Sequence, residues 1–395
     1  MSNLVDNVFT MQYLSQEHLI GFENYKYSAK DTSPLSKYVM HPFWNAVVKL
    51  CPRSVAPNVL TFVGFLFTAS NFVLLSYYDY YYYGASDAPP GDAYPSIPRW
   101  LWFLMALNHF LAHTLDGIDG KQARRTNTSG PLGELFDHGL DSWTAFFIPA
   151  CLWSVFGRND FSITPWRFYF VLFNVLICFY TSHWEKYLTK VLFLPWGYDV
   201  SQVIIFVIYI LTGIFDTQLW KFELYPGVPS GSMFEFMLYA GSLASSLPMS
   251  FYNIYCSYRD GTGKMLGLVE AVRPLWNPAV LFAICTLWLV KSPTDIVDRD
   301  PRLFLYLIGV IFANINCRLI VSQMSGSRCE LLNWQLLLLA ACMFASFLLP
   351  STEMFFLVAL SVVATAAHIH YGVQVVRQMC DHFHIQCFSI KDRID

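Results

Sequence analysis

Charged side chains are scarce in this sequence. Of its 395 residues only 13% are Asp, Glu, Lys or Arg, whereas 55% are hydrophobic, and the mean hydropathy is +0.40. Soluble domains carry about twice this density of charge, at roughly 25%. The composition therefore excludes an ordinary soluble protein and predicts an integral membrane protein. The net charge of −3 is too small to indicate nucleic acid as a partner, or a polybasic membrane anchor.

Three further features are absent. The N-terminal sequence MSNLVDNVFTMQYLSQEH has no basic region followed by an apolar run, so we expect the first span to act as the targeting signal. The ten cysteines are scattered and none forms a CxxC pair, which favours buried small hydrophobic residues over disulfides or a zinc site. No internal repeat is evident, which argues against a transporter built from inverted halves.

Long apolar segments are abundant. Each is expected to be a helix, because backbone groups in lipid must be hydrogen-bonded within their own segment. The sequence predicts an all-α polytopic membrane protein with about ten transmembrane helices, and residues 10–53 predict N-terminal helices lying at the membrane interface. The windows long enough to cross about 30 Å of hydrocarbon are 59–78, 99–115, 138–156, 167–183, 199–217, 233–254, 275–291, 303–320, 331–349 and 353–373.

Positive charge predicts the orientation of these spans. Five basic residues precede the first span, none lies in the loop at 79–98, and Lys121, Arg124 and Arg125 lie in the next loop. Basic residues collect in cytosolic loops. We therefore expect both termini and the loop at 121–131 in the cytosol, and the loop at 79–98 in the lumen.

Four aspartates lie together between two apolar segments, in the stretch DGIDGKQARRTNTSGPLGELFDHGLD. Asp116 and Asp119 are three residues apart and Asp137 and Asp141 are four apart, so each pair leaves one face of a helix. A lone Asp at a helix end is usually a cap or a solvated residue. A carboxylate in a bilayer costs roughly 2.5–3.5 kcal/mol, so four of them predict a functional cage for hard divalent cations.

The same stretch offers partners for a phosphate and for a proton. Gly120, Ala123 and Gly133 are small enough to let a ligand approach the backbone, and Arg124 is suited to phosphate oxygens. Glu134 and His138 are four residues apart on the same predicted helix. A carboxylate beside an imidazole fixes its tautomer and raises its basicity, so we predict His138 as the catalytic base and Glu134 as its orienting partner. The alternative is a helical pair that only packs.

The spacing Asp116-x2-Asp119-Gly120-x2-Ala123-Arg124-x8-Gly133-x3-Asp137-x3-Asp141 resembles the motif of the CDP-alcohol phosphotransferases at every position. The flanking stretches KYSAKDTSPLSKYVMHPFWN, APNVLTF, SHWEKY and AHIHYGV are similar to the eukaryotic choline/ethanolamine phosphotransferases, and the similarity covers nearly the whole chain. The resemblance implies a dimeric enzyme of the endoplasmic reticulum or Golgi membrane. It would transfer phosphoethanolamine from CDP-ethanolamine to diacylglycerol, giving phosphatidylethanolamine and CMP, with two Mg²⁺ or Mn²⁺ ions.

The resemblance also assigns roles to residues. It makes Asp116, Asp119, Asp137 and Asp141 the metal ligands, and it makes Asp141 a second candidate for the base. Asn58 and Thr61 resemble a nucleotide-contacting motif, although alone they indicate only a helix start. Glu185, Lys186 and Tyr187 end another cytosolic helix, where they either line the site or anchor the helix at the interface.

We expect four segments: an N-terminal interfacial segment at 1–56, catalytic helices at 57–220, C-terminal helices with the lipid cavity and dimer contacts at 221–376, and a cytosolic tail at 377–395. Three alternatives remain open. Cholinephosphotransferase or dual specificity shares the same motif. A cation transporter would need acidic residues near mid-bilayer, and an inactive lipid-binding scaffold would not need an intact motif.

Overall fold

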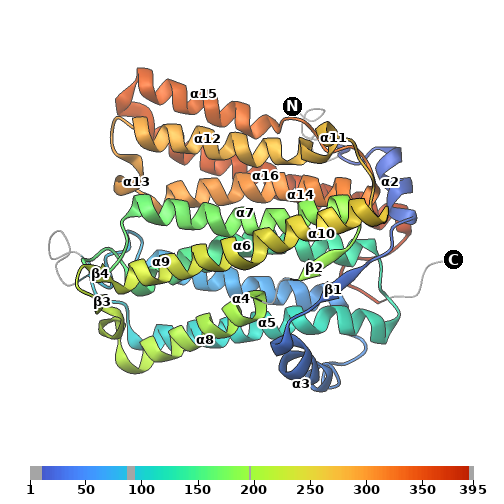
Figure 1. The fold of residues 1–395 in the computed structure, drawn as a ribbon, viewed down its shortest axis with the longest axis horizontal. Coiled ribbons are helices and arrows are strands. Elements are labelled where there is room, and N and C mark those ends of the chain that lie inside the picture. Colours follow the sequence, from blue (N-terminus) through green and yellow to red (C-terminus); the bar gives the residue numbers. More distant parts are fainter. Residues whose placement is uncertain (1–10, 87–93, 195–196, 391–395) are drawn as a thin grey trace, which may run out of the picture.

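Long helices dominate the computed structural model, which describes residues 11–86, 94–194 and 197–390. They run side by side in one bundle (Figure 1). Most of every apolar window is helical, which confirms the all-α class. The helices at these windows are α4 (Pro57–Tyr78), α5 (Arg99–Thr126), α6 (Pro131–Phe156), α7 (Pro165–Thr189), α8 (Gly197–Phe215), α9 (Ser230–Gly241) with α10 (Leu247–Asp260), α12 (Trp276–Lys291), α14 (Pro301–Ser325), α15 (Trp334–Leu348) and α16 (Glu353–Phe383).

Proline marks the start of several of these helices. Pro57, Pro131, Pro165 and Pro301 stand at the first positions of α4, α6, α7 and α14, where a missing backbone N–H costs nothing. Helix α5 ends at Asn127, whose φ of 56° is left-handed and stops the helix. The turn from Asn127 to Pro131 therefore brings the last turn of α5 beside the first turn of α6.

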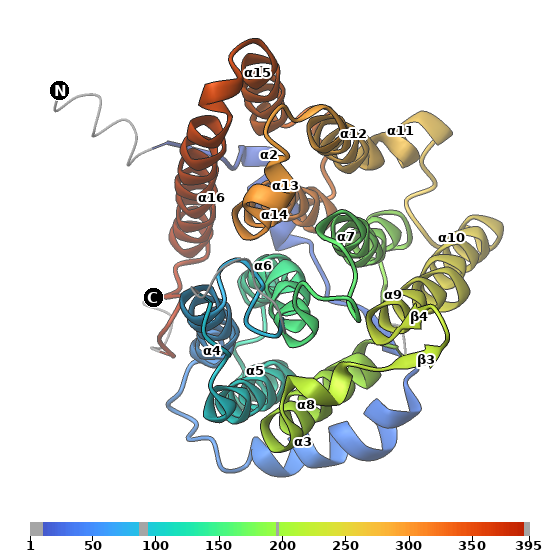
Figure 2. The same cartoon turned by 90° about the vertical axis from the view of Figure 1, so that its left-hand side faces the viewer.

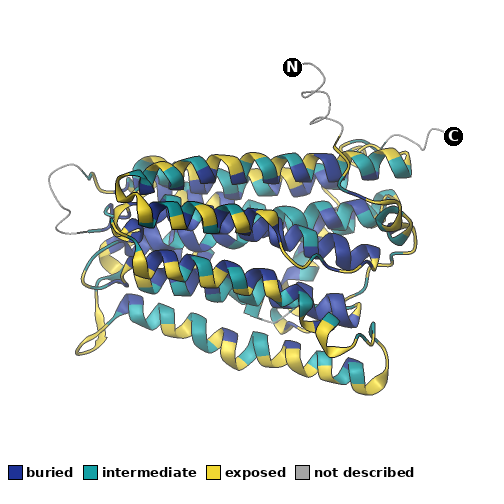
Figure 3. Cartoon of the chain, turned by 90° about the horizontal axis from the view of Figure 1, so that it is seen from above, coloured by how far each residue is buried: buried dark blue, intermediate teal, exposed yellow. Residues whose placement is uncertain are grey.

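Five helical segments in the described ranges are long and apolar enough to cross a membrane, so the protein is a multi-pass membrane protein. They are Pro57–Tyr78, Gly197–Phe215, Leu268–Lys291, Pro301–Ser325 and Pro350–Phe383. The other windows hold helices that are shorter or more polar, so the count of ten spans stays a prediction. Large apolar side chains are exposed at Val73 on α4, at Leu337 on α15, and at Phe355 and Val362 on α16, as expected for contact with lipid. Exposed positions recur along the helices at the outside of the bundle (Figure 3).

Helix α14 is the centre of the bundle. Most of its apolar span, 89%, is buried, and it packs against α6, α7, α12 and α16 (Figure 2). Gly309 permits a close approach of α6, because a Cβ atom there would clash with the ring of Phe146. Helices α4, α5, α6 and α8 form a second group on one side of this centre.

Short elements cover the two ends of the bundle. One end holds the starts of α4, α6 and α8 and the ends of α5 and α7, and we call it the motif end (Figure 1). The described parts of the loop at 79–98 lie at the other end. The short helices at the ends are α2 (Gln16–Glu23), η1 (Ser36–Met40), α3 (His41–Val47), η2 (Thr217–Trp220), α11 (Leu268–Val272), η4 (Arg273–Leu275), α13 (Ile296–Arg299) and η5 (Pro350–Thr352). A further short segment, η3 (Ser242–Ser246), joins α9 to α10 within the bundle.

Two small sheets complete the fold. At the motif end β1 (Ala29–Asp31) pairs in parallel with β2 (Leu192–Leu194), which follows α7. At the opposite end β3 (Glu223–Tyr225) pairs antiparallel with β4 (Val228–Pro229). Short helices are present within residues 10–53, as expected, while their place at a membrane interface stays a prediction. The expected tail at 377–395 extends past the last described residue.

Candidate active site

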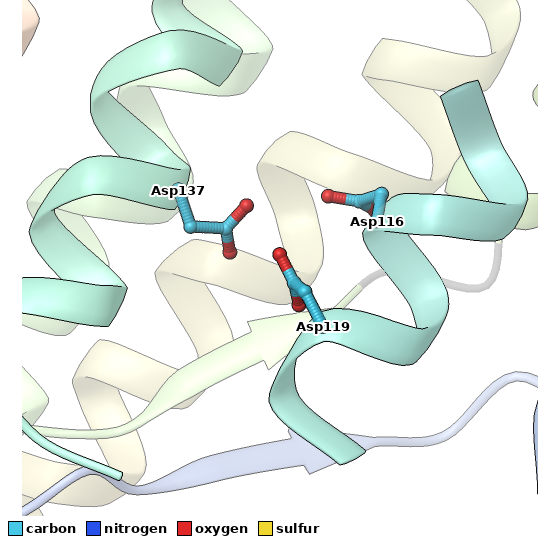
Figure 4. Close-up of side chains that lie close together, drawn as sticks. All are labelled: Asp116, Asp119 and Asp137. Atoms are coloured by element: carbon cyan, nitrogen blue, oxygen red, sulfur yellow. The ribbon is translucent and has the colours of Figure 1, made fainter. Parts of the chain in front are cut away.

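Three of the four motif aspartates converge between two helices. Asp116 and Asp119 project from α5 and Asp137 projects from α6, and one carboxylate oxygen of each lies within 4.8 Å of the others. Figure 4 shows the three carboxylates pointing toward one another. Carboxylates held this close repel each other, and a hard divalent cation removes that repulsion. The donor set therefore fits the predicted metal cage. Asp137 Oδ1, which is buried without a hydrogen-bond partner among the described residues, supports this fit.

Asp141 lies one turn beyond Asp137 on α6. It is not one of the three aspartates whose oxygens converge, but it lines a pocket together with Asp116, Asp137, Thr61 and Tyr198. Its predicted roles as fourth ligand or as base stay predictions.

Helix α4 supplies two polar side chains to the cage. Thr61 Oγ1 donates a hydrogen bond of 2.6 Å to Asp119 Oδ2, which fixes that carboxylate. Asn58 Oδ1 would lie 3.6 Å from a Cβ atom at Gly133, so the first turns of α4 and α6 meet here. The Asn58 amide donates a 3.0 Å hydrogen bond to the carbonyl oxygen of Cys387. The structure thus brings Asn58, Thr61 and Gly133 to the edge of the cage.

The last turns of α5 carry the residues predicted to bind phosphate. The backbone N–H of Gly120 donates to Asp119 Oδ1. Arg124 Nη1 would lie 3.7 Å from a Cβ atom at Gly120, so the exposed guanidinium lies beside the cage. Ala123 is half-buried in the same turn, and its carbonyl accepts a 2.9 Å hydrogen bond from the backbone of Thr128.

Glu134 is held by different partners from those the sequence predicts. Its buried carboxylate accepts hydrogen bonds from the ammonium of Lys186 and from the Tyr25 hydroxyl, the latter at 2.8 Å. Burial and the charge of Glu134 raise the pKa of Tyr25, so its hydroxyl stays protonated and donates. His138 Nδ1 lies 3.6 Å from Glu134 Oε1, beyond hydrogen-bond distance, and has no partner among the described residues.

Only one of the three residues Glu185, Lys186 and Tyr187 reaches the site. Glu185 accepts a 2.8 Å hydrogen bond from Asn253 on α10, and the ring of Tyr187 lies under the ammonium of Lys264 at 3.8 Å. Consecutive residues of a helix point in different directions, so Lys186 faces Glu134 while its two neighbours face other elements.

Three residues near the site escaped the sequence analysis. Tyr25 and Tyr27 lie in the range 10–53, for which the sequence predicts interfacial helices, but both rings lie against Lys186. The ring of His183 lies 5.1 Å from that of His138. The sequence did offer a signal for these three residues, because they lie in or beside stretches that resemble the family. Tyr27 lies in KYSAKDTSPLSKYVMHPFWN, Tyr25 directly precedes that stretch, and His183 lies in SHWEKY.

A carboxylate cage between the ends of two helices, with an arginine and glycines beside it, defines the class of this protein as a membrane-embedded phosphotransferase. Residues 54–226 match the family model of the CDP-alcohol phosphatidyltransferases, and the chain belongs to this family.

Named relatives match along nearly the full chain. The chain is 46% identical over 383 residues to ethanolaminephosphotransferase 1 of Mus musculus, covering 96% of this chain and 95% of the relative. It is 45% identical over 382 residues to the Homo sapiens protein of the same name, with the same coverage. Identity to choline/ethanolaminephosphotransferase 1 of Arabidopsis thaliana is 30% over 406 residues, covering 96% of this chain and 99% of the relative.

Proposed function

We propose that this protein has ethanolaminephosphotransferase activity: it transfers phosphoethanolamine from CDP-ethanolamine to diacylglycerol and releases phosphatidylethanolamine and CMP. The observation that carries the proposal is the cage of Asp116, Asp119 and Asp137, in a chain that is 45–46% identical over 96% of its length to relatives named for this activity.

Asp116, Asp119 and Asp137, with Asp141, would hold Mg²⁺ or Mn²⁺. Two such metal ions per site would neutralise the charge of the diphosphate and stabilise the departing CMP phosphate. Arg124 binds phosphate oxygens from the side, while Gly120 and Gly133 leave room for the nucleotide. Asn58 contacts the cytidine or ribose, and Thr61 keeps Asp119 oriented.

The hydroxyl oxygen of diacylglycerol attacks the β-phosphorus, and the bond from that phosphorus to the CMP oxygen breaks. His138 Nε2 lies 3.9 Å from Asp137 Oδ2, so this nitrogen faces the cage and takes the hydroxyl proton. The other ring nitrogen, Nδ1, faces Glu134 at 3.6 Å from Oε1, and a small movement of either side chain would form a hydrogen bond between these two atoms. Asp141 is the alternative base.

Several finer assignments belong to the same proposal. The diacylglycerol site is an apolar cavity that opens to the bilayer near His138. The protein acts as a homodimer in the endoplasmic reticulum or Golgi membrane, with the motif end in the cytosol. Residues 57–220 form the catalytic part, and residues 221–376 contribute the lipid cavity and dimer contacts.

Competition between the two CDP-alcohols tests the proposal. Purified protein in lipid nanodiscs receives diacylglycerol and equal amounts of CDP-ethanolamine and CDP-choline, and both lipid products are measured. The expected result is an excess of phosphatidylethanolamine. Faster formation of phosphatidylcholine would replace the proposal with cholinephosphotransferase activity, and absence of both products would remove transferase activity altogether.

A further inference from the structure

The side chain of Lys186 occupies a small box at the motif end. Its ammonium lies 5.7 Å from the ring centroid of Tyr25 and 5.1 Å from that of Tyr27, and it donates to the Glu134 carboxylate. Lys186 itself is only 1% exposed. Two aromatic faces and a carboxylate around one nitrogen are the features that bind an ammonium group. We call Tyr25, Tyr27 and Glu134 the ammonium box.

The chain holds the two tyrosines at this place by contacts on both sides of them. Before them, α2 packs on α14 so closely that a Cβ atom at Gly21 would clash with the carbonyl oxygen of Ser325. After them, β1 pairs with β2, and Ala29 is in register with Leu192, three residues after the end of α7. The segment of Tyr25 and Tyr27 is therefore fixed beside the end of α7, which carries Lys186.

The ammonium box lies next to the metal cage. Glu134 precedes Asp137 by three residues on α6, which is about 4.5 Å along a helix axis. The hydroxyl of Tyr27 lies within electrostatic reach of Glu134, Asp137 and Asp119. The ethanolamine headgroup has only two carbons between its phosphate oxygen and its nitrogen. A phosphate at the cage therefore places the headgroup nitrogen near this box.

We propose that Tyr25, Tyr27 and Glu134 form the subsite for the ammonium of the ethanolamine headgroup, and that the substrate ammonium takes the place now held by the ammonium of Lys186. The inference rests on the proposed function and deepens it. Both groups are primary ammoniums on a carbon chain, so the box makes the same contacts with either. The flexible four-carbon stem of Lys186 lets it withdraw, and the box keeps one positive charge throughout the exchange.

Glu134 gives the box a means to distinguish headgroups. Its Oε2 atom is buried and has no hydrogen-bond partner among the described residues, while Oε1 accepts from both Tyr25 and Lys186. A primary ammonium brings three N–H donors, enough for both carboxylate oxygens. The trimethylammonium of choline has none, so it would leave the buried Oε2 unpaired and Oε1 with the Tyr25 hydroxyl alone. An unpaired buried carboxylate oxygen costs free energy, so the box should disfavour choline.

Equilibrium binding tests the aromatic side of the box. Tyr27 is 56% exposed, so its replacement need not disturb the core. Tyr27→Leu should weaken CDP-ethanolamine binding about 3- to 30-fold, the range of a lost cation–π contact, while CMP, which has no headgroup, binds as to the wild type. Tyr27→Phe keeps the ring and should stay close to the wild type. Equal losses for CMP and CDP-ethanolamine, or none for either, would overturn the inference.

Lys186→Met tests the exchange. Removing the resident ammonium should leave CDP-ethanolamine bound at least as tightly as in the wild type, relative to CMP. A selective loss of CDP-ethanolamine affinity would show that Lys186 supports the headgroup and is not replaced by it. These outcomes differ from failure of the proposed function, because then the wild type itself would not turn over CDP-ethanolamine.

Discussion

In the proposed mechanism, His138 takes the proton from the diacylglycerol hydroxyl. Its Nε2 faces Asp137 and its Nδ1 faces Glu134, at 3.9 and 3.6 Å, so the ring stands between the metal cage and the ammonium box. His138→Ala should slow the chemical step about 10²- to 10⁴-fold, the usual contribution of a general base. CDP-ethanolamine binding should persist, because the cage and Arg124 remain. Single-turnover kinetics with a parallel binding titration measure both.

The opposite pattern would reassign the residue. If His138→Ala lost nucleotide affinity while turnover at saturating substrate was retained, His138 would be a binding residue and Asp141 the better base.

The aspartates could be predicted because their spacing alone puts them on two helix faces. The partners of Glu134 could not, because Lys186 lies 52 positions away and Tyr25 lies 109 positions away. The local spacing of four residues favoured His138 as the partner of Glu134. The tertiary fold instead brings the ammonium of Lys186 closer to the Glu134 carboxylate than the His138 ring.

At the scale of elements, the C-terminal segment returns to the site after α16. Helix α16 ends at Phe383, and the next residue, His384, has a left-handed φ of 52°. The carbonyl of Cys387 then accepts from Asn58, and the ring of Phe388 lies 5.7 Å from Phe62 on α4 and 5.6 Å from Phe136 on α6. The segment thereby contacts the first turns of both α4 and α6. Asn58 and Gly133 lie close together at these same two turns.

Removal of the Phe388 ring should loosen this connection. Phe388→Ala loses two aromatic contacts worth about 0.5–1.5 kcal/mol each, so the midpoint of thermal unfolding should fall by a few degrees. Ile385→Ala is the matched control, because it truncates a partly exposed apolar residue of the same segment that has no aromatic contact with α4 or α6. Equal midpoints for both variants would show that Phe388 does not fasten the segment.

The sequence predicted the long helices well, but it did not predict the pairing of the short strands β1 and β2. Apolar windows with proline at their starts specify helices locally, as for α4, α6 and α14. The strands β1 and β2 are three residues each and come from distant parts of the chain, 29–31 and 192–194. No local pattern of that length indicates a strand, so only the packing of α2 and α7 brings them together. The ammonium box depends on this pairing and therefore escaped prediction.

At the scale of the whole molecule, the charge pattern predicts which end faces the cytosol. Ser129, between the end of α5 and the start of α6, and Ser96, before the start of α5, are both exposed, so matched Ser→Cys variants can report on the two ends. The ten native cysteines would first be replaced or blocked. In sealed microsomes an impermeant thiol reagent should label Ser129→Cys from outside and should reach Ser96→Cys only after detergent. The reverse pattern would invert the proposed topology.

The proposed phosphoethanolamine transfer requires a divalent metal, which Asp116, Asp119 and Asp137 would hold. Formation of phosphatidylethanolamine from CDP-ethanolamine and diacylglycerol tests it most directly, measured for purified wild type and Asp137→Asn in chelator and then with added Mg²⁺ or Mn²⁺. The wild type should lose activity in chelator and regain it with the metal. Asp137→Asn should unfold at the same temperature as the wild type in chelator and show no activity at any metal concentration. Near wild-type turnover by Asp137→Asn, or turnover by the wild type in excess chelator, would contradict the account.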